Sequence, residues 1–148
     1  MTLNELMIKH NFVTKILLRD GDKELSRDLK VKLMGMRIKL GKVRKELEED
    51  LQEVVKELTP EDYQELVMKE NKTDEDKAQV EAWNKQINEE YNAYVDKRGK
   101  EEVQIDTTLS EDEFAQIIEV NAGNDVEING TKLNAADFLE VLYSLFVA

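Results

Sequence analysis

Apolar residues recur at helical spacing through residues 26–58. They lie three or four positions apart, at Leu29, Leu33, Met36, Leu40, Val43, Leu47, Leu51, Val54 and Leu58. That spacing is typical of the seam of a long amphipathic helix or a coiled-coil strand, and Ser26 is a favourable N-cap for it. Such a helix would be roughly 50 Å long, so we expect it to need a partner helix.

A second seam predicts that partner within the same chain. Residues 75–97 carry apolar and aromatic positions at helical spacing, namely Val80, Trp83, Ile87, Tyr91 and Tyr94. Antiparallel pairing of the two seams would place residues 59–74 at the tip of a hairpin and residues 37–44 opposite 87–94. Residues 3–18 have a looser helical pattern, and we expect this first helix to fold back on the start of the second.

Local signals predict where the other elements begin and end. Residues 19–22 are typical of a turn, and Thr59 before Pro60 predicts a short helix that runs to about Lys69. Residues 103–106 alternate like a strand. Further on, we expect a Ser110–Glu113 capping box, an Asn129-Gly130 hairpin turn and a last helix over residues 135–147, mostly core with a partly exposed strip.

These elements predict a mainly α fold of the α+β type. The predicted architecture is a long antiparallel helical hairpin with a small C-terminal α/β unit that contains a β-hairpin. We expect two domains: residues 1–100, with the N-terminal helix and the long hairpin, and residues 101–148, with the small unit.

Composition narrows the classes of function. Charged residues make up 36 % of the chain and the net charge is −12, which favours solubility and opposes generic nucleic-acid binding. The chain has no cysteine, which excludes disulfides, thiolate metal sites and cysteine nucleophiles. Its start lacks the pattern of a signal peptide and no apolar run approaches about 20 residues, so we expect no secretion signal and no association with a membrane.

Candidate catalytic and metal-binding residues are few. His10 lies between polar neighbours, which predicts a surface position and no metal site. Residues 125–130 resemble the start of a calcium loop, but Ala136 stands where position twelve needs a glutamate. The sequence has neither a phosphate-binding glycine loop nor a histidine beside a serine. We therefore expect no enzymatic activity, no metal and no cofactor.

Charge is segregated along the long helix. Residues 26–45 contain eight basic residues and one acid, whereas residues 46–53 contain five acids and no base. Lys30, Arg37 and Arg44 share one flank of the seam and Lys39 lies on the other, so these four are the predicted partner-binding residues. The sequence leaves three roles open: a charge match within the chain, contact with nucleic acid or an acidic partner, and self-association.

Two glycines, Gly35 and Gly41, interrupt the same helix, each at a cost of roughly 1 kcal/mol relative to alanine. They indicate either close approach by the first helix or by another chain, or a tolerated local weakness.

The order of these features resembles that of small uncharacterised proteins of tailed bacteriophages. The resemblance rests on the early short helix, on the basic stretch DLKVKLMGMRIKLGKVRKELEEDLQEVVKEL that becomes glutamate-rich, and on the tail DVEINGTKLNAADFLEVLYSLF. It covers the layout of most of the chain. It implies an accessory or virion-associated protein without enzymatic activity, in the host cytoplasm or the particle, and it implies no site residues.

The leading functional hypothesis is a non-enzymatic assembly or interaction protein that binds a protein partner or itself, with an oligomer expected. One alternative is an acidic anti-defence decoy that binds and inhibits a host nucleic-acid-binding protein. Residues 46–75, with twelve acids and three bases, motivate it. The other alternative, less favoured because of the net charge, is a nucleic-acid-binding accessory protein that uses the basic stripe of residues 27–45.

Overall fold

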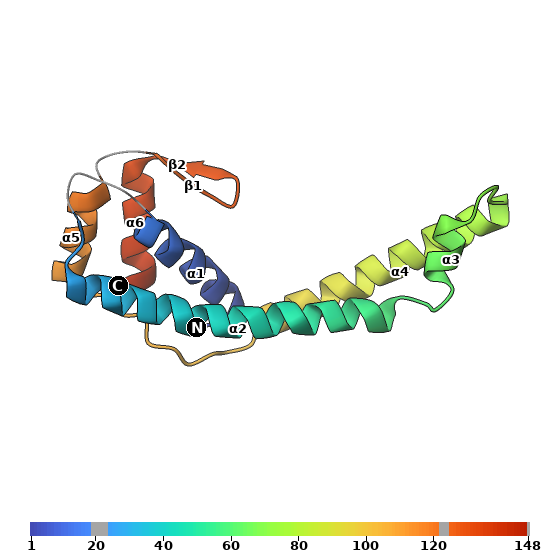
Figure 1. Cartoon of the computed structure of the whole chain (residues 1–148), viewed down its shortest axis with the longest axis horizontal. Coiled ribbons are helices and arrows are strands. Elements are labelled where there is room, and N and C mark those ends of the chain that lie inside the picture. Colours follow the sequence, from blue (N-terminus) through green and yellow to red (C-terminus); the bar gives the residue numbers. More distant parts are fainter. Residues whose placement is uncertain (19–23, 122–124, 148) are drawn as a thin grey trace. The chain divides into compact units, whose positions relative to one another are not determined.

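The computed structural model describes residues 1–18, 24–121 and 125–147. These residues form six helices and one two-stranded sheet, which confirms the predicted mainly α fold with a C-terminal β-hairpin (Figure 1). The elements are α1 (Leu3–Leu18), α2 (Arg27–Leu58), α3 (Tyr63–Met68), α4 (Asp74–Gly99), α5 (Glu111–Asn121), β1 (Val126–Ile128), β2 (Thr131–Leu133) and α6 (Ala135–Phe146). The predicted turn at residues 19–22 lies outside the described residues.

The chain divides into two compact units. The first, here called the core unit, comprises Met1–Arg44 and Glu102–Ala148; the second, the hairpin unit, comprises Lys45–Glu101. The division therefore falls inside α2, whereas the boundary expected from the sequence was at residue 100. It reflects packing between segments that are far apart in the chain, which a change of composition along the sequence does not report.

The first part of α2 lies against α1 in the core unit. A Cβ atom on Gly41 would lie 3.3 Å from Nε2 of His10, so α1 approaches the backbone of α2 closely, which was one of the alternatives left open for this glycine. On α6, the ring of Phe138 stacks on that of Phe12 in α1, with centroids 5.3 Å apart. The fully buried side chains of the unit come from α1, α2, α6 and the segment before α5; the largest are Leu6, Val13, Leu29, Leu33, Leu40, Leu109, Phe138 and Leu142.

The segment between α4 and α5 is irregular, so the predicted strand at residues 103–106 is wrong. Its backbone forms hydrogen bonds to other segments near each of its two ends. The amide of Val103 donates to the carbonyl of Met1 at 2.7 Å, and the amide of Leu109 donates to the carbonyl of Phe146 at 2.9 Å. A strand needs a neighbour along its whole length, and alternation of residues alone does not provide one.

The C-terminal hairpin follows the prediction closely. β1 and β2 pair antiparallel with Val126 opposite Leu133. The turn residues Asn129 and Gly130 have φ angles of 51° and 76°. Positive φ at both central positions is the requirement of a two-residue hairpin turn, and Asn-Gly satisfies it at low cost.

The hairpin unit pairs α4 with the second part of α2. The hydroxyl of Tyr94 donates to Oδ2 of Asp50 at 2.5 Å, and Nε of Arg98 lies 3.2 Å from the same oxygen. The antiparallel pairing was predicted, but its register was not. Residues 87–94 were expected opposite residues 37–44, whereas Tyr94 is hydrogen-bonded to Asp50. That earlier stretch of α2 is occupied by α1.

The helix at the tip is shorter than expected. It begins at Tyr63 instead of Pro60. The hydroxyl of Thr59 donates to the carbonyl of Val55 at 2.6 Å and so bonds the end of α2 instead of capping α3. The amide of Tyr63 donates to the carbonyl of Pro60 at 3.1 Å, which closes a turn between the two helices.

Candidate interaction surface

Two of the four predicted binding residues make contacts at the edge of α2 in the core unit. Lys30 Nζ lies 3.3 Å from Oε2 of Glu24, in an exposed ion pair. Arg37 Nε donates to Oγ1 of Thr14 on α1 at 3.1 Å. Because both residues border the buried seam, their charged ends reach groups of the same chain.

Arg44 is the most enclosed of the four. Its Nη1 donates to Oδ1 of Asn11 at 2.9 Å and lies 3.0 Å from Nδ1 of His10. His10 itself is half-buried, so the predicted surface position for this histidine is wrong. Its ring packs between the guanidinium of Arg44 and the bare backbone of Gly41. We interpret this cluster as part of the contact between α1 and α2.

Lys39 is exposed on the other flank of the seam. It is one of the charges near Asp106, whose carboxylate accepts a hydrogen bond from the backbone amide of Thr108 at 3.0 Å. That bond, with smaller contributions from Lys32 and Lys39, holds the pKa of Asp106 below its usual value. Lys39 thus contributes to the local field and remains accessible.

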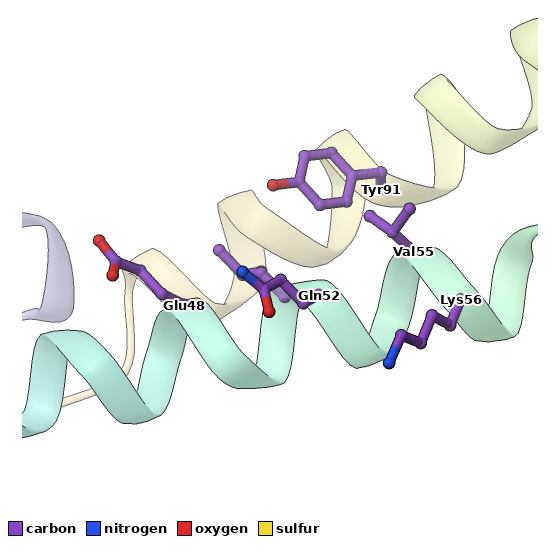
Figure 2. A pocket seen from close by; sticks show the side chains of 6 residues that line it. Glu48, Gln52, Val55, Lys56 and Tyr91 are labelled. Carbon is purple, nitrogen blue, oxygen red and sulfur yellow. The ribbon is translucent and has the colours of Figure 1, made fainter.

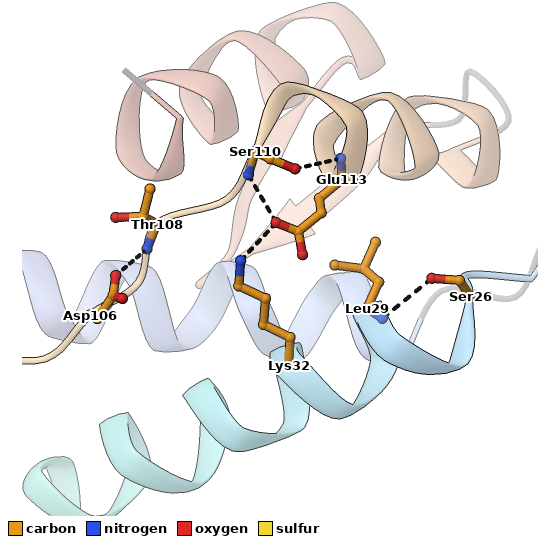
Figure 3. A network of polar contacts seen from close by, with 7 residues as sticks. All are labelled: Ser26, Leu29, Lys32, Asp106, Thr108, Ser110 and Glu113. Atoms are coloured by element: carbon orange, nitrogen blue, oxygen red, sulfur yellow. Dashed lines mark hydrogen bonds and ion pairs between the residues drawn. The ribbon is translucent and has the colours of Figure 1, made fainter.

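A polar network fixes the start of α5 to α2 (Figure 3). Glu113 Oε1 accepts from Nζ of Lys32 at 2.7 Å and from the amide of Ser110 at 2.9 Å. The amide of Glu113 in turn donates to Oγ of Ser110, which confirms the predicted capping box. Burial raises the pKa of Glu113, but the bonds from Lys32 and Ser110 outweigh it, and the pKa lies below its usual value.

The outermost face of this part of α2 is apolar. Val31, Met34 and Ile38 are 64 %, 44 % and 65 % exposed, and they lie one helical turn apart on the side opposite the buried seam. Gly35 lies among them, and a Cβ atom there would meet nothing within 4 Å. We call Val31, Met34, Gly35 and Ile38 the outer stripe.

Basic residues border the outer stripe at both ends and along its sides. Arg27 and Lys42 lie on the same face, one turn before and one turn after it, and both are exposed. Within the described part of the chain, neither makes a hydrogen bond or an ion pair. Asp28 is the single acid of residues 26–45. The surface is therefore an apolar line within a strongly positive field.

The outer stripe was not predicted from the sequence, although its signal was present. Val31, Met34 and Ile38 are spaced three and four residues apart, like the main seam. We interpreted only the more regular of two apolar lines on one helix. Which line forms the core depends on where α1 and α6 pack.

Open hollows lie among the described residues of the hairpin unit. One, of about 520 Å³, lies between α2 and α4, and its lining includes Val55 and Lys56 on α2 and Tyr91 on α4 (Figure 2). Another, of about 480 Å³, lies beside Trp83 near the tip. Their linings combine apolar and charged side chains.

Lys9 on α1 is partly withdrawn from solvent. Its Nζ donates to Oγ1 of Thr107 at 2.8 Å and lies 5.7 Å from the ring centroid of Phe146. Burial lowers the pKa of Lys9, and the carboxylate of Glu5 partly offsets that effect. The side chain connects α1, α6 and the segment before α5, which is a structural role.

Within the described residues, no group of three or more histidine, cysteine or acidic side chains is placed to hold a metal ion. The same residues include no helix that is long and apolar enough to cross a membrane.

Comparisons with known proteins provided no match for this chain, whether among protein families, curated proteins or solved structures. The resemblance to bacteriophage proteins therefore stays a prediction.

Proposed function

We propose that the protein is a non-enzymatic interaction protein that binds a protein partner through the outer stripe of α2. One observation supports this above all others: three large apolar side chains in a row remain between 44 % and 65 % exposed on a helix whose opposite face is buried. Single exposed apolar residues are ordinary on protein surfaces, whereas a contiguous group bordered by polar residues marks an interaction site.

The expected strength of such a contact is moderate. Complete burial of a valine, methionine or isoleucine side chain stabilises a complex by about 1.5–3 kcal/mol, and less where the side chain is already half-covered. Three such residues account for a few kcal/mol, from which the loss of motion on association is subtracted. The basic border would then set orientation and association rate more than affinity. These magnitudes support a reversible interaction.

The biological setting that we propose is that of an accessory or virion-associated protein of a tailed bacteriophage, as an assembly or interaction component. This part rests on the resemblance in layout alone. The alternatives of nucleic-acid binding and of an acidic decoy stay open as proposals. An apolar line through the middle of the basic face supports a protein partner over a phosphate backbone, which is contacted by charged and polar groups.

The test uses two designed helical peptides and the full-length protein. Both peptides carry the same leucine stripe, flanked by glutamates in one and by lysines in the other, and binding is measured by fluorescence anisotropy. We expect the glutamate-flanked peptide to bind at least about tenfold more tightly, since the border of the stripe is basic. Equal binding of the two peptides, or of neither, would contradict the proposal.

A matched pair of variants locates the binding site. Ile38→Glu places a charge in the outer stripe, whereas Val55→Glu makes the same change at an exposed apolar position of the same helix in the hairpin unit. Ile38→Glu should weaken peptide binding about tenfold or more and Val55→Glu should not. Duplex DNA provides a further comparison. If the wild-type protein binds duplex DNA, and Lys42→Glu loses this binding while Ile38→Glu keeps it, the result would instead support the nucleic-acid alternative.

A further inference from the structure

The core unit has a second exposed face whose chemistry is the converse of the outer stripe. On α5, Ile118 is 45 % exposed and lies one turn beyond Phe114. The ring of Phe114 packs edge-on against that of Tyr143 on α6, with centroids 5.2 Å apart, and Tyr143 is 39 % exposed. Glu111 and Glu140 lie one turn before these side chains on their helices, and both are exposed. We call these five residues the acidic face.

The charges around the two faces are opposite. Residues 101–148 contain eleven acids and a single base, Lys132, whereas residues 26–45 have eight bases and one acid. The acidic face thus presents apolar side chains within a negative field, and the outer stripe presents them within a positive one. Opposite potentials of this kind favour docking of one surface on the other.

The same charges oppose the simplest alternative, in which the outer stripes of two copies pair with each other. Arg27 precedes the stripe and Lys42 follows it, while Lys30 and Lys39 lie at its edges. Either parallel or antiparallel pairing would bring these bases together, and like charges across an interface weaken it. The occupant must therefore supply acids beside its apolar side chains.

We infer that the occupant of the outer stripe is the acidic face of a second copy of this chain. This inference rests on the proposed function and specifies its partner. Both faces belong to the core unit, where α5 begins beside α2: Lys32 Nζ lies 2.7 Å from Glu113, and the amide of Ser26 donates to Oε1 of Gln116 at 3.2 Å. Two copies related by a two-fold axis could therefore use both faces at once, in an isologous dimer.

Gly35 adds a steric argument. Since a Cβ atom there would meet nothing within 4 Å among the described residues, their packing does not require glycine at that position. A bare backbone between Val31 and Ile38 allows a helix of the second copy to approach α2 closely.

The decisive experiment is a charge swap read by sedimentation velocity on the full chain. The basic-side variant combines Arg27→Glu with Lys42→Glu, and the acidic-side variant combines Glu111→Lys with Glu140→Lys. We expect the wild-type protein to dimerise in the micromolar range and each variant alone to dimerise at least about tenfold more weakly. An equimolar mixture of the two should recover association to within about threefold of the wild type, because each reversed face meets a reversed partner.

A control separates a local from a general effect of charge. The control variant combines Lys85→Glu with Lys97→Glu, on exposed residues of α4 in the hairpin unit, and changes the net charge by as much as the basic-side variant does. This control should dimerise as the wild type does. Circular dichroism verifies the helical content of each variant, and recovery in the mixture shows independently that both variants are folded.

Each other outcome overturns the inference in a recognisable way. A wild-type protein that stays monomeric at about 500 µM, yet binds the glutamate-flanked peptide, would keep the proposed function and exclude a second copy as the partner. If both variants still dimerise, or if mixing them does not restore association, the dimer would be assigned to another surface. Failure of both self-association and peptide binding would remove the proposed function as well.

Discussion

The two units of this protein bury apolar residues very differently. In the core unit, helices α1, α2, α5 and α6 enclose leucine, isoleucine, valine and phenylalanine side chains that are almost wholly withdrawn from solvent. In the hairpin unit, Leu47 is the one apolar side chain, among those that the structure describes, that reaches the same degree of burial. Both units use the same helix α2, so the difference lies in what packs against it.

The hairpin unit shows how little two helices can enclose. Among the described residues, the second part of α2 pairs with α4, only the short helix α3 adds to that pair, and the seam residues of α4, from Val80 to Tyr94, are all half-buried. Polar contacts at its two ends supplement this packing. Asp50 accepts from Tyr94 and pairs with Arg98 at one end, and Lys69 pairs with Asp76 at the other. Exposed pairs of this kind contribute about 0–1 kcal/mol each, so we expect the hairpin unit to open more readily.

The largest predicted effect compares one leucine from each unit on the same helix. Leu33→Ala removes a fully buried side chain of the core unit and should cost about 3 kcal/mol of unfolding free energy. Leu51→Ala removes a half-buried one in the hairpin unit and should cost about 1 kcal/mol, because less surface is taken from water. Urea unfolding measures both, and equal losses would contradict the difference between the units.

The next prediction compares the same cap chemistry in the two units. Ser110 caps α5 and Thr73 caps α4, each in a reciprocal capping box. Replacing either with alanine should cost about 1 kcal/mol. Hydrogen exchange should locate the loss: faster exchange at the start of α5 for Ser110→Ala, and through the tip of the hairpin unit for Thr73→Ala. Uniform acceleration over both units in either variant would argue against their independence.

A third pair of variants distinguishes the two glycines of α2. Gly35→Ala should raise the unfolding free energy by about 1 kcal/mol, since alanine favours helix and its Cβ atom meets nothing. Gly41→Ala should gain less or lose stability, because its Cβ atom would lie 3.3 Å from His10 Nε2 and that ring is held by Arg44. Thermal unfolding of the two variants side by side provides the measurement. Equal gains in stability would show that the His10 side chain moves aside at little cost.

The smallest predicted effect is a pH dependence in the hairpin unit. The hydrogen bond to Asp50, followed by burial, raises the pKa of Tyr94. A pKa that is raised in the folded state gives a contribution to stability that is present below the ordinary tyrosine value of about 10 and is lost as the pH rises through the folded value. Absorbance at alkaline pH should show one tyrosine that ionises late. That component should vanish in Tyr94→Phe, and its persistence there would refute the assignment.

Much of the fold follows from short-range signals. The extent of α2, the capping box of Ser110 and Glu113, the Asn129-Gly130 turn and the start of α6 at Ala135 were all predicted, and each depends on residues at most four positions apart. The expected cap at Thr59 failed for a local reason, the hydrogen bond from its hydroxyl to the carbonyl of Val55, but two other predictions failed because of distant partners. Among the described residues, the alternation at residues 103–106 has no strand to pair with, and His10 is covered because Gly41 leaves room for its ring.

The candidate site shows the same limit. Residues 26–45 were recognised as basic and as a region for binding, yet Lys30, Arg37 and Arg44 contact groups of the core unit itself. The outer stripe lies on the opposite side of α2. Its three apolar positions could be read from the sequence, but their exposure could not, because it depends on which face α1 and α6 cover.

By itself, the sequence determined the longer helices, the caps of α2 and α5, the β-hairpin and the separation of charge along α2, because periodicity, capping and turn geometry act over a few residues. Packing of α2 on α1 and on α4 was expected, but only the tertiary structure decided where along α2 the one contact ends and the other begins, and which of its apolar lines is buried. Burial is a property of contacts between distant segments. The outer stripe, on which the proposed function rests, is what those contacts leave uncovered.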